Sequence, residues 1–149
     1  MTFTDAERVY LTAQHLGCLA SLGPGGGPQV KPVAYRLDPE TDVIDIGGPW
    51  LTASQKYRNI AADPRVSFVV HDEAEEPVGP GGQRGRGLEI RGTAELLTLE
   101  EPMIPGFTKD VIRVHARRIV AWNIDGPGPN FRDVAPPGAP KILSSPDGA

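Results

Sequence analysis

One segment of the chain decides the fold, and it reads Gly48-Pro49-Trp50-Leu51-Thr52-Ala53-Ser54-Gln55-Lys56-Tyr57-Arg58-Asn59-Ile60-Ala61-Ala62-Asp63-Pro64-Arg65. Thr52 and Gln55 have the spacing of a capping box and predict a helix from Ala53 to Ala62, which Pro64 cannot continue. Strand-like residues precede and follow this helix, so it is an insertion in a β-protein. The free N–H groups of a helix N-terminus favour an anion, and Lys56 adds a full positive charge. The segment therefore predicts a phosphate site and a phosphorylated cofactor.

Alternating apolar and polar side chains predict strands on both sides of this segment. The clearest alternation runs over residues 88–96. Further strands are predicted at 18–22, 29–37, 43–46, 66–71, 111–115 and 118–122. Clusters of Gly and Pro at 23–28, 77–87, 126–129 and 136–140 predict the loops between and after them. Short strands at this spacing predict a mainly β fold, a six- to seven-stranded antiparallel barrel.

The two ends of the chain differ in pattern. Thr4 and Glu7 form a capping box, and the apolar spacing that follows predicts an N-terminal helix that Gly17 ends. From Asp125 onward the sequence is rich in Pro and Gly and has no periodicity. We therefore expect one domain over residues 1–125 and an irregular tail over 126–149.

The composition excludes several classes of protein. With 149 residues, 39% of them hydrophobic and 23% charged, the chain is expected to be globular. The net charge of −4 does not favour a nucleic-acid partner, and no apolar run approaches the roughly 20 residues of a membrane span. Cys18 is the only cysteine and no signal peptide is visible, so the cytoplasm is expected. His71 and His115 lack ligand-like spacing, so no metal site is expected.

Several segments, in a characteristic order, resemble one known superfamily. They are Leu19-Ala20-Ser21, Pro28-Gln29-Val30-Lys31-Pro32-Val33, Ile44-Asp45-Ile46-Gly47-Gly48, Ser54-Gln55-Lys56-Tyr57-Arg58-Asn59-Ile60, Asp63-Pro64-Arg65-Val66 and Glu89-Ile90-Arg91-Gly92-Thr93-Ala94-Glu95. Over residues 5–125 the chain resembles the pyridoxamine-phosphate-oxidase-like split-barrel superfamily of flavin and deazaflavin proteins. The resemblance implies a homodimer of split barrels with two cofactors at the subunit interface.

Within that superfamily, the chain is most similar to an actinobacterial branch that uses the deazaflavin coenzyme F420. The ending Ile112-Arg113-Val114-His115 followed by 118–125 is similar to one subgroup of that branch. The similar subgroup includes tailoring reductases of aromatic polyketides such as dehydrotetracyclines. The resemblance implies a reductase that transfers a hydride to an activated C=C (enone-type) or C=N bond of a small molecule. The classical oxidase has an Arg-Lys pair where this chain has Gln55-Lys56, which counts against a pyridoxamine phosphate oxidase and disfavours FMN.

The resemblance also implies which residues bind the cofactor. Lys56 would hold its phosphate with Ser54 and Gln55 beside it, and Lys31 would be a second basic ligand. The surface under the ring system would consist of Pro32, Val33, Ile46, Gly47 and Gly48. The two glycines suit this place because a flat ring can approach a backbone that carries no Cβ. Trp50 and Arg91 complete the cofactor-binding candidates.

Other interpretations of these residues stay open at this point. Lys56 can be a solvated surface lysine, Trp50 can anchor its helix in the core, and Arg91 can form a cross-strand ion pair with a glutamate. Arg84 and Arg86, in a glycine-rich loop, can close over an anionic ligand. No catalytic acid–base pair is visible.

Two rival functions stay open as well. One is an FMN-dependent oxidoreductase on the same fold. The other is a non-catalytic protein that binds the cofactor or a tetrapyrrole. For a reductase of enones, backbone N–H groups, Tyr57, Arg91 or a water are the candidates to stabilise the developing enolate oxygen.

Overall fold

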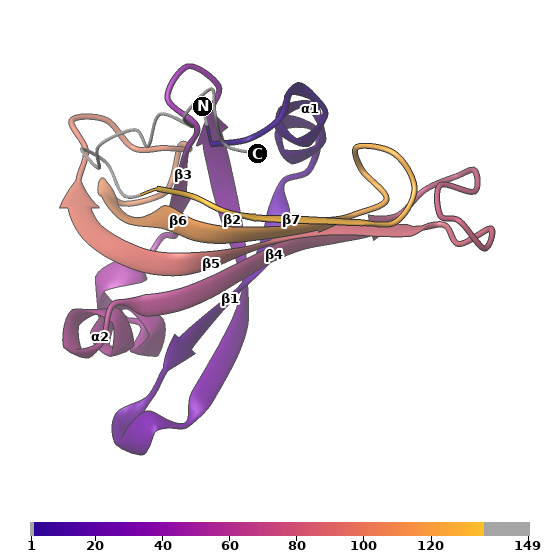
Figure 1. The fold of residues 1–149 in the computed structure, drawn as a ribbon. Coiled ribbons are helices and arrows are strands. Elements are labelled where there is room, and N and C mark those ends of the chain that lie inside the picture. Colours follow the sequence, from indigo (N-terminus) through magenta and orange to yellow (C-terminus); the bar gives the residue numbers. More distant parts are fainter. Residues whose placement is uncertain (1, 136–149) are drawn as a thin grey trace, which may run out of the picture.

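The computed structural model describes residues 2–135, which form a β-barrel with two helices (Figure 1). The helices and strands are α1 (Asp5–Ala13), β1 (Leu16–Leu22), β2 (Pro28–Asp38), β3 (Val43–Gly47), α2 (Gln55–Ala62), β4 (Arg65–Glu73), β5 (Gly85–Thr98), β6 (Asp110–Trp122) and β7 (Pro129–Asp133). Short 3-10 turns lie at Pro24–Gly26 and Leu51–Ala53. The predicted mainly β fold, with an N-terminal and an inserted helix, is confirmed.

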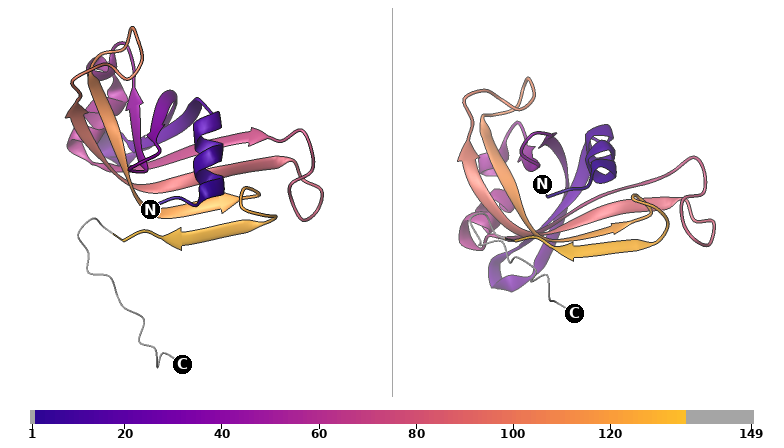
Figure 2. Two further views of the ribbon diagram at one scale, coloured as in Figure 1. Left: turned by 90° about the horizontal axis from the view of Figure 1, so that it is seen from above. Right: turned by 45° about the horizontal axis from the view of Figure 1, so that its top comes forward.

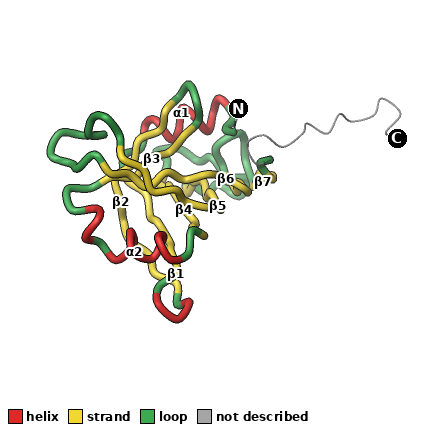
Figure 3. Tube along the Cα trace, turned by 90° about the vertical axis from the view of Figure 1, so that its left-hand side faces the viewer, coloured by secondary structure: helices red, strands yellow, loops and turns green. Residues whose placement is uncertain are grey.

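Six of the strands close into the barrel. Their order is β3-β2-β1-β4-β5-β6, all neighbours are antiparallel, and β3 pairs with the first half of β6 to complete the circle. The second half of β6 pairs instead with β7, which lies outside the closed barrel. Figure 3 shows α1 and α2 at opposite ends of this barrel.

Inward-facing side chains fill the barrel, as expected for one of this size. Phe68 and Ile46 have no exposed surface, and Tyr35 packs edge-on against Phe68 with 5.3 Å between the ring centres. The Phe68 ring explains Gly17, where a Cβ would lie 2.4 Å from it. The prediction that Gly17 ends the first helix is therefore wrong: α1 ends at Ala13, and Gly17 belongs to β1.

A β-bulge joins two predicted strands into one. The stretches 111–115 and 118–122 are both part of β6, because Arg91 pairs with Arg118 while the next residue, Gly92, pairs with Ala116. Arg117 is the extra residue. The bulge shifts the alternation by one position, which is why the sequence pattern looks interrupted there.

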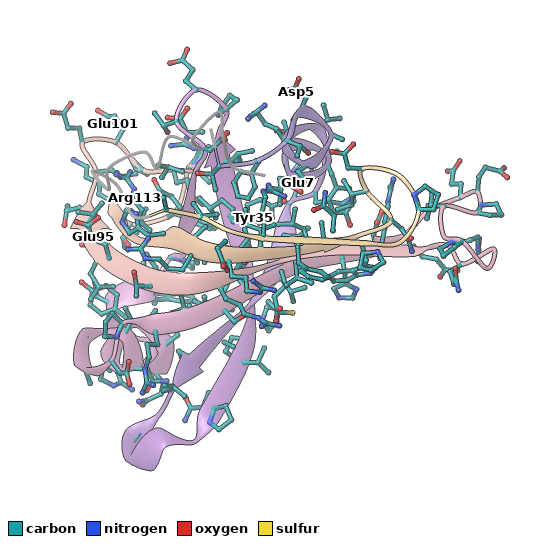
Figure 4. All side chains as sticks on the ribbon, viewed as in Figure 1. Asp5, Glu7, Tyr35, Glu95, Glu101 and Arg113 are labelled. Atoms are coloured by element: carbon teal, nitrogen blue, oxygen red, sulfur yellow. The ribbon has the colours of Figure 1, made fainter. Side chains whose placement is uncertain are left out.

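The N-terminal helix covers one end of the barrel. Its predicted capping box is confirmed: the Thr4 Oγ1 accepts from the Glu7 N–H at 3.1 Å, and Glu7 accepts from the Thr4 N–H. The Tyr35 hydroxyl, inside the barrel, donates to the Leu11 carbonyl at 2.6 Å. Glu7 has no exposed surface and lies on the barrel side of α1 (Figure 4), where Arg132 of β7 forms an ion pair with it.

Two long hairpins, β4–β5 and β6–β7, extend together away from the barrel (Figure 2). Asn123, in the turn after β6, joins them because its side-chain amide donates to the Gly85 carbonyl at 2.8 Å. The stretch predicted to be irregular from Asp125 contains a strand, β7, and the part of that tail over 136–149 lies outside the described residues. Among residues 2–135, no helix is long and apolar enough to cross a membrane.

Candidate functional site

The lysine-bearing helix starts two residues later than its sequence pattern predicts. Ser54, not Thr52, is its N-cap, since the Ser54 Oγ accepts from the Tyr57 N–H and donates to the Leu51 carbonyl. Thr52 lies within the preceding 3-10 turn. Both residues have the right chemistry for a cap, and the turn decides between them.

Four of the predicted cofactor-binding residues meet in one surface hollow of about 290 Å³. We call it the Trp50 hollow, and its lining is Gly48, Pro49, Trp50, Leu51, Ala53, Ser54 and Lys56. Nothing lies within 4 Å of the position that a Cβ of Gly48 would take, so the backbone is open there. The Trp50 side chain is 79% exposed, which rules out the alternative that it anchors the helix in the core.

Two lysines give this part of the surface its charge. Lys56 is half-buried, while Lys31 is exposed on β2 opposite Leu19. Burial, and to a smaller extent the charge of Lys31, lower the pKa of Lys56 below its ordinary value. Within the part of the chain that the structure describes, neither lysine forms a salt bridge with a carboxylate. We call Lys31 and Lys56 together the basic corner, and both charges are open to an anion.

A buried amide that the sequence reasoning missed ties α2 to the β1–β2 hairpin. Asn59 is 3% exposed and donates to the Ser21 Oγ at 3.0 Å and to the Gln29 Oε1 at 2.9 Å. Its own carbonyl oxygen accepts from Gln55 at 2.7 Å. The side chain of Gln55, a predicted phosphate ligand, is thus engaged within its own helix, where it also accepts from Arg58.

The predicted ring-binding surface divides into three environments. Val33 and Ile46 are core residues, 5% and 0% exposed, so the prediction that they form the surface under the ring is not met by their side chains. Gly47 is buried as well, and the Phe107 ring lies 3.1 Å from where its Cβ would be. The missing Cβ at this position thus makes room for Phe107, whereas at Gly48 it leaves open space.

The turn that carries Phe107 also holds the end of β3. The Thr108 N–H donates to the Gly48 carbonyl at 3.2 Å, and the Thr108 hydroxyl approaches the same oxygen at 3.4 Å. Sequence reasoning did not link this turn to the site. The contact spans 60 residues and has no local signal.

Pro32 and Arg91 lie on the outer face of the sheet, away from the core-facing side chains. Arg91 forms an ion pair with Glu89 at 2.7 Å, along its own strand and not across strands.

The two arginines of the glycine-rich loop are also paired. Arg86 holds Asp72 through two hydrogen bonds, and Arg84 pairs with Glu73.

One transverse row of the outer face is almost entirely apolar. The strand registers place Pro32, Cys18, Val69, Glu89, Val120 and Phe131 next to one another, and we call them the outer row. Phe131 is 59% exposed. Pro32 is exposed as well, and the four residues between these two ends are half-buried. A partly exposed and largely apolar row is typical of a surface that meets another protein.

The closed barrel, with a lysine-bearing helix across one end and an open backbone beside it, defines a split-barrel protein with a basic corner. The model of the pyridoxamine 5'-phosphate oxidase family matches residues 3–125. The chain belongs to this family, as its sequence segments suggest.

Among proteins of known function, the chain is similar to the 5a,11a-dehydrotetracycline/5a,11a-dehydrooxytetracycline reductase of Streptomyces rimosus. The two are 39% identical over 139 residues, which cover 90% of this chain and 94% of the reductase.

Solved structures support the fold at lower identity. A conserved hypothetical protein from Mycobacterium tuberculosis has a TM-score of 0.62 at 23% identity, with 92% of this chain and 95% of that one covered. A heme binding protein from Mycobacterium smegmatis has a TM-score of 0.63 at 18% identity, covering 89% and 59% of the two chains. The FAD binding protein from the same organism has a TM-score of 0.57 at 15% identity, covering 78% and 92%.

Proposed function

We propose that this protein is a reductase that uses reduced coenzyme F420 to add a hydride to an electron-poor C=C bond of a polycyclic small molecule, such as a dehydrotetracycline. The observation that carries the proposal is the 39% identity to the dehydrotetracycline reductase over nearly the whole of both chains. Such a reaction belongs to antibiotic biosynthesis in the cytoplasm. A C=N bond is the alternative acceptor.

The residues of the Trp50 hollow fit a ligand that has a flat ring and a phosphate. Lys56 and Lys31 offer two ammonium groups without carboxylate partners among the described residues, which suits a phosphodiester. The open backbone of Gly48 leaves room for a ring edge, and the exposed indole of Trp50 offers a face for stacking. When bound, the reduced deazaflavin supplies the hydride.

The protein's contribution is to hold the two ring systems in place and to keep water away. Lys56 and Lys31 bind at the phosphate and do not touch the reacting bond. The described lining of the hollow holds no carboxylate and no histidine, so we expect orientation of the bound rings to carry most of the rate. A backbone N–H, the Tyr57 hydroxyl or a water then stabilises the oxygen of the reduced enone.

We further propose that the working form is a homodimer, with the cofactor at the interface. The apolar outer row supports this, because burying it against a second copy removes its exposed apolar surface from water. In such a dimer Arg91 and Pro32, which lie on the outer face, are at the interface between the two copies.

The first test is a pair of titrations of the purified protein with oxidised F420 and with FMN, followed by cofactor fluorescence at fixed ionic strength. We expect F420 to bind at micromolar concentration or tighter, and Lys56→Ala to weaken it at least tenfold, since one charge-assisted contact is worth about 1.5–3 kcal/mol. Lys109→Ala removes the same charge from the β5–β6 turn and should leave binding unchanged.

Three outcomes would contradict the proposal. Binding of FMN alone would place the protein among flavin enzymes of this fold. Tight F420 binding without reduction of 5a,11a-dehydrotetracycline or any other activated alkene would indicate a non-catalytic cofactor carrier. Binding of neither coenzyme would mean that the basic corner binds a different anion.

A further inference from the structure

The chain holds two like charges together at its basic corner, and a side chain that touches neither of them connects their elements. We propose that Asn59 is the positioning residue that keeps Lys31 and Lys56 together as one binding site for a phosphate-bearing ligand. The inference rests on the proposed function, in which these two lysines hold the cofactor phosphate.

Asn59 has no freedom to turn. Both N–H groups of its amide are used, on Ser21 at 3.0 Å and on Gln29 at 2.9 Å, and its oxygen accepts from Gln55 at 2.7 Å. Asn59 is only 3% exposed, so water cannot replace a bond that this amide fails to make. The amide therefore fixes the distance between α2 and the β1–β2 hairpin.

The same contact also determines where the two lysines lie relative to each other. Gln29 and Lys31 are two residues apart on β2, so they share one face of the strand. Lys56 and Asn59 are three residues apart on α2, so they share one side of the helix. The contact between Gln29 and Asn59 thus places the next pair, Lys31 and Lys56, beside each other. Figure 1 shows α2 next to this hairpin at the lower end of the barrel.

Two ammonium groups so placed repel each other, and α2 would move away from the hairpin if nothing held it. The lowered pKa of Lys56, caused by burial and by the charge of Lys31, agrees with this crowding. The titratable group that faces Lys56 from the hairpin is Lys31, and on α2 itself Arg58 is turned to the Ala53 carbonyl and Gln55. An anion that arrives finds both charges already in place and does not have to order them.

The test removes the exposed end of this connection, so that folding is not at risk. Gln29→Ala is prepared in the full chain, and binding of inorganic pyrophosphate, F420 and FMN is measured by calorimetry. We expect binding to weaken roughly fivefold, the equivalent of one hydrogen bond. Gln14→Ala is the matched control, because it removes an amide bonded to Asp72 in another part of the molecule and should change nothing.

A double-mutant cycle separates positioning from a general loss of structure. If Gln29 acts through the lysine pair, Gln29→Ala should cost less than twofold in a Lys31→Ala background. Asn59→Ser, which keeps one donor, should weaken binding more than Gln29→Ala does.

Three results would overturn the inference: a wild-type protein that binds none of the three probes, a Gln29→Ala protein that binds as tightly as wild type, or an equal loss with and without Lys31. Binding of pyrophosphate without either coenzyme would leave the inference standing and contradict the proposed function instead.

Discussion

Gly92 lies on β5 where the bulge of β6 crosses it, and no other residue type fits there. A Cβ at this position would lie 1.9 Å from the His115 carbonyl oxygen and 3.0 Å from its carbon. These are backbone atoms of a paired strand, so neither can move aside without breaking the ladder.

Gly92→Ala is therefore expected to lower the free energy of unfolding by about 3 kcal/mol or more. Urea denaturation measures the change. The control is Gly85→Ala on the same strand, where nothing lies within 4 Å of the new methyl group and the change should stay within about 0.5 kcal/mol. Equal stability of the two variants would contradict the assignment of the bulge.

Lys56 makes the stability of the free protein depend on alkaline pH. Its pKa in the folded state lies below the ordinary 10.5, so between these two values the unfolded chain binds more protons than the folded one. Stability contributed by this group therefore rises with pH across that interval, and its charge lowers stability below it.

The variant Lys56→Met should remove this rise. Without an anion, we expect it to be more stable than wild type by about 0.5 kcal/mol at pH 7, the size of a close repulsive pair, and to lose the advantage near pH 10.5. Parallel urea titrations at the two pH values check this. A constant difference between the proteins would show that Lys56 does not titrate early.

At the scale of elements, the sequence pattern predicts the strands and the first helix cap well, but the cap of α2, the end of α1 and the contacts between elements poorly. The alternation over 88–96 and the capping box of Thr4 correspond to β5 and α1, because both signals are local. The bulge at Arg117 interrupts the alternation, so the pattern predicts two strands where the structure has one, β6. β7 carries too few apolar residues to show a period of two.

The candidate site divides in the same way. Lys56 and Gly48 are close in sequence, and that both belong to one site could be predicted. Asn59 could not be recognised, because an asparagine three residues after a lysine on a helix looks like a second surface residue. Its partners lie 38 and 30 residues away.

The attachment of α1 to β7 gives a prediction at this scale. Arg132 donates to Glu7 and to the Thr2 carbonyl, and Glu7 has no exposed surface. Arg132→Met would leave a buried carboxylate with only its own helix cap, at a cost of about 3 kcal/mol.

Arg118→Met is the control for this prediction, since it breaks the exposed pair with Asp133 on the same two strands and should cost less than about 1 kcal/mol. Denaturation of both variants in urea, monitored by tryptophan fluorescence, measures the difference. Similar losses of stability in the two variants would mean that the buried Arg132–Glu7 pair contributes no more than the exposed pair.

For the whole molecule, the outer row predicts association. A particle of twice the chain mass of 15.9 kDa is expected in light scattering. Val120→Glu places a charge in the row, opposite Glu89, and should give monomers and weaken coenzyme binding together. Val9→Glu changes an exposed valine of α1 and should keep the dimer. Monomers of the wild-type protein would contradict the proposed assembly.

The ion pair between Arg132 and Glu7 also bears on how the chain is made. The two residues are 125 positions apart, so during synthesis Glu7 is finished long before its partner leaves the ribosome. The first helix cannot settle on the barrel with its carboxylate satisfied until Arg132 has emerged. Folding of the barrel is therefore expected to be completed in one late cooperative step, and not progressively from the first helix onward.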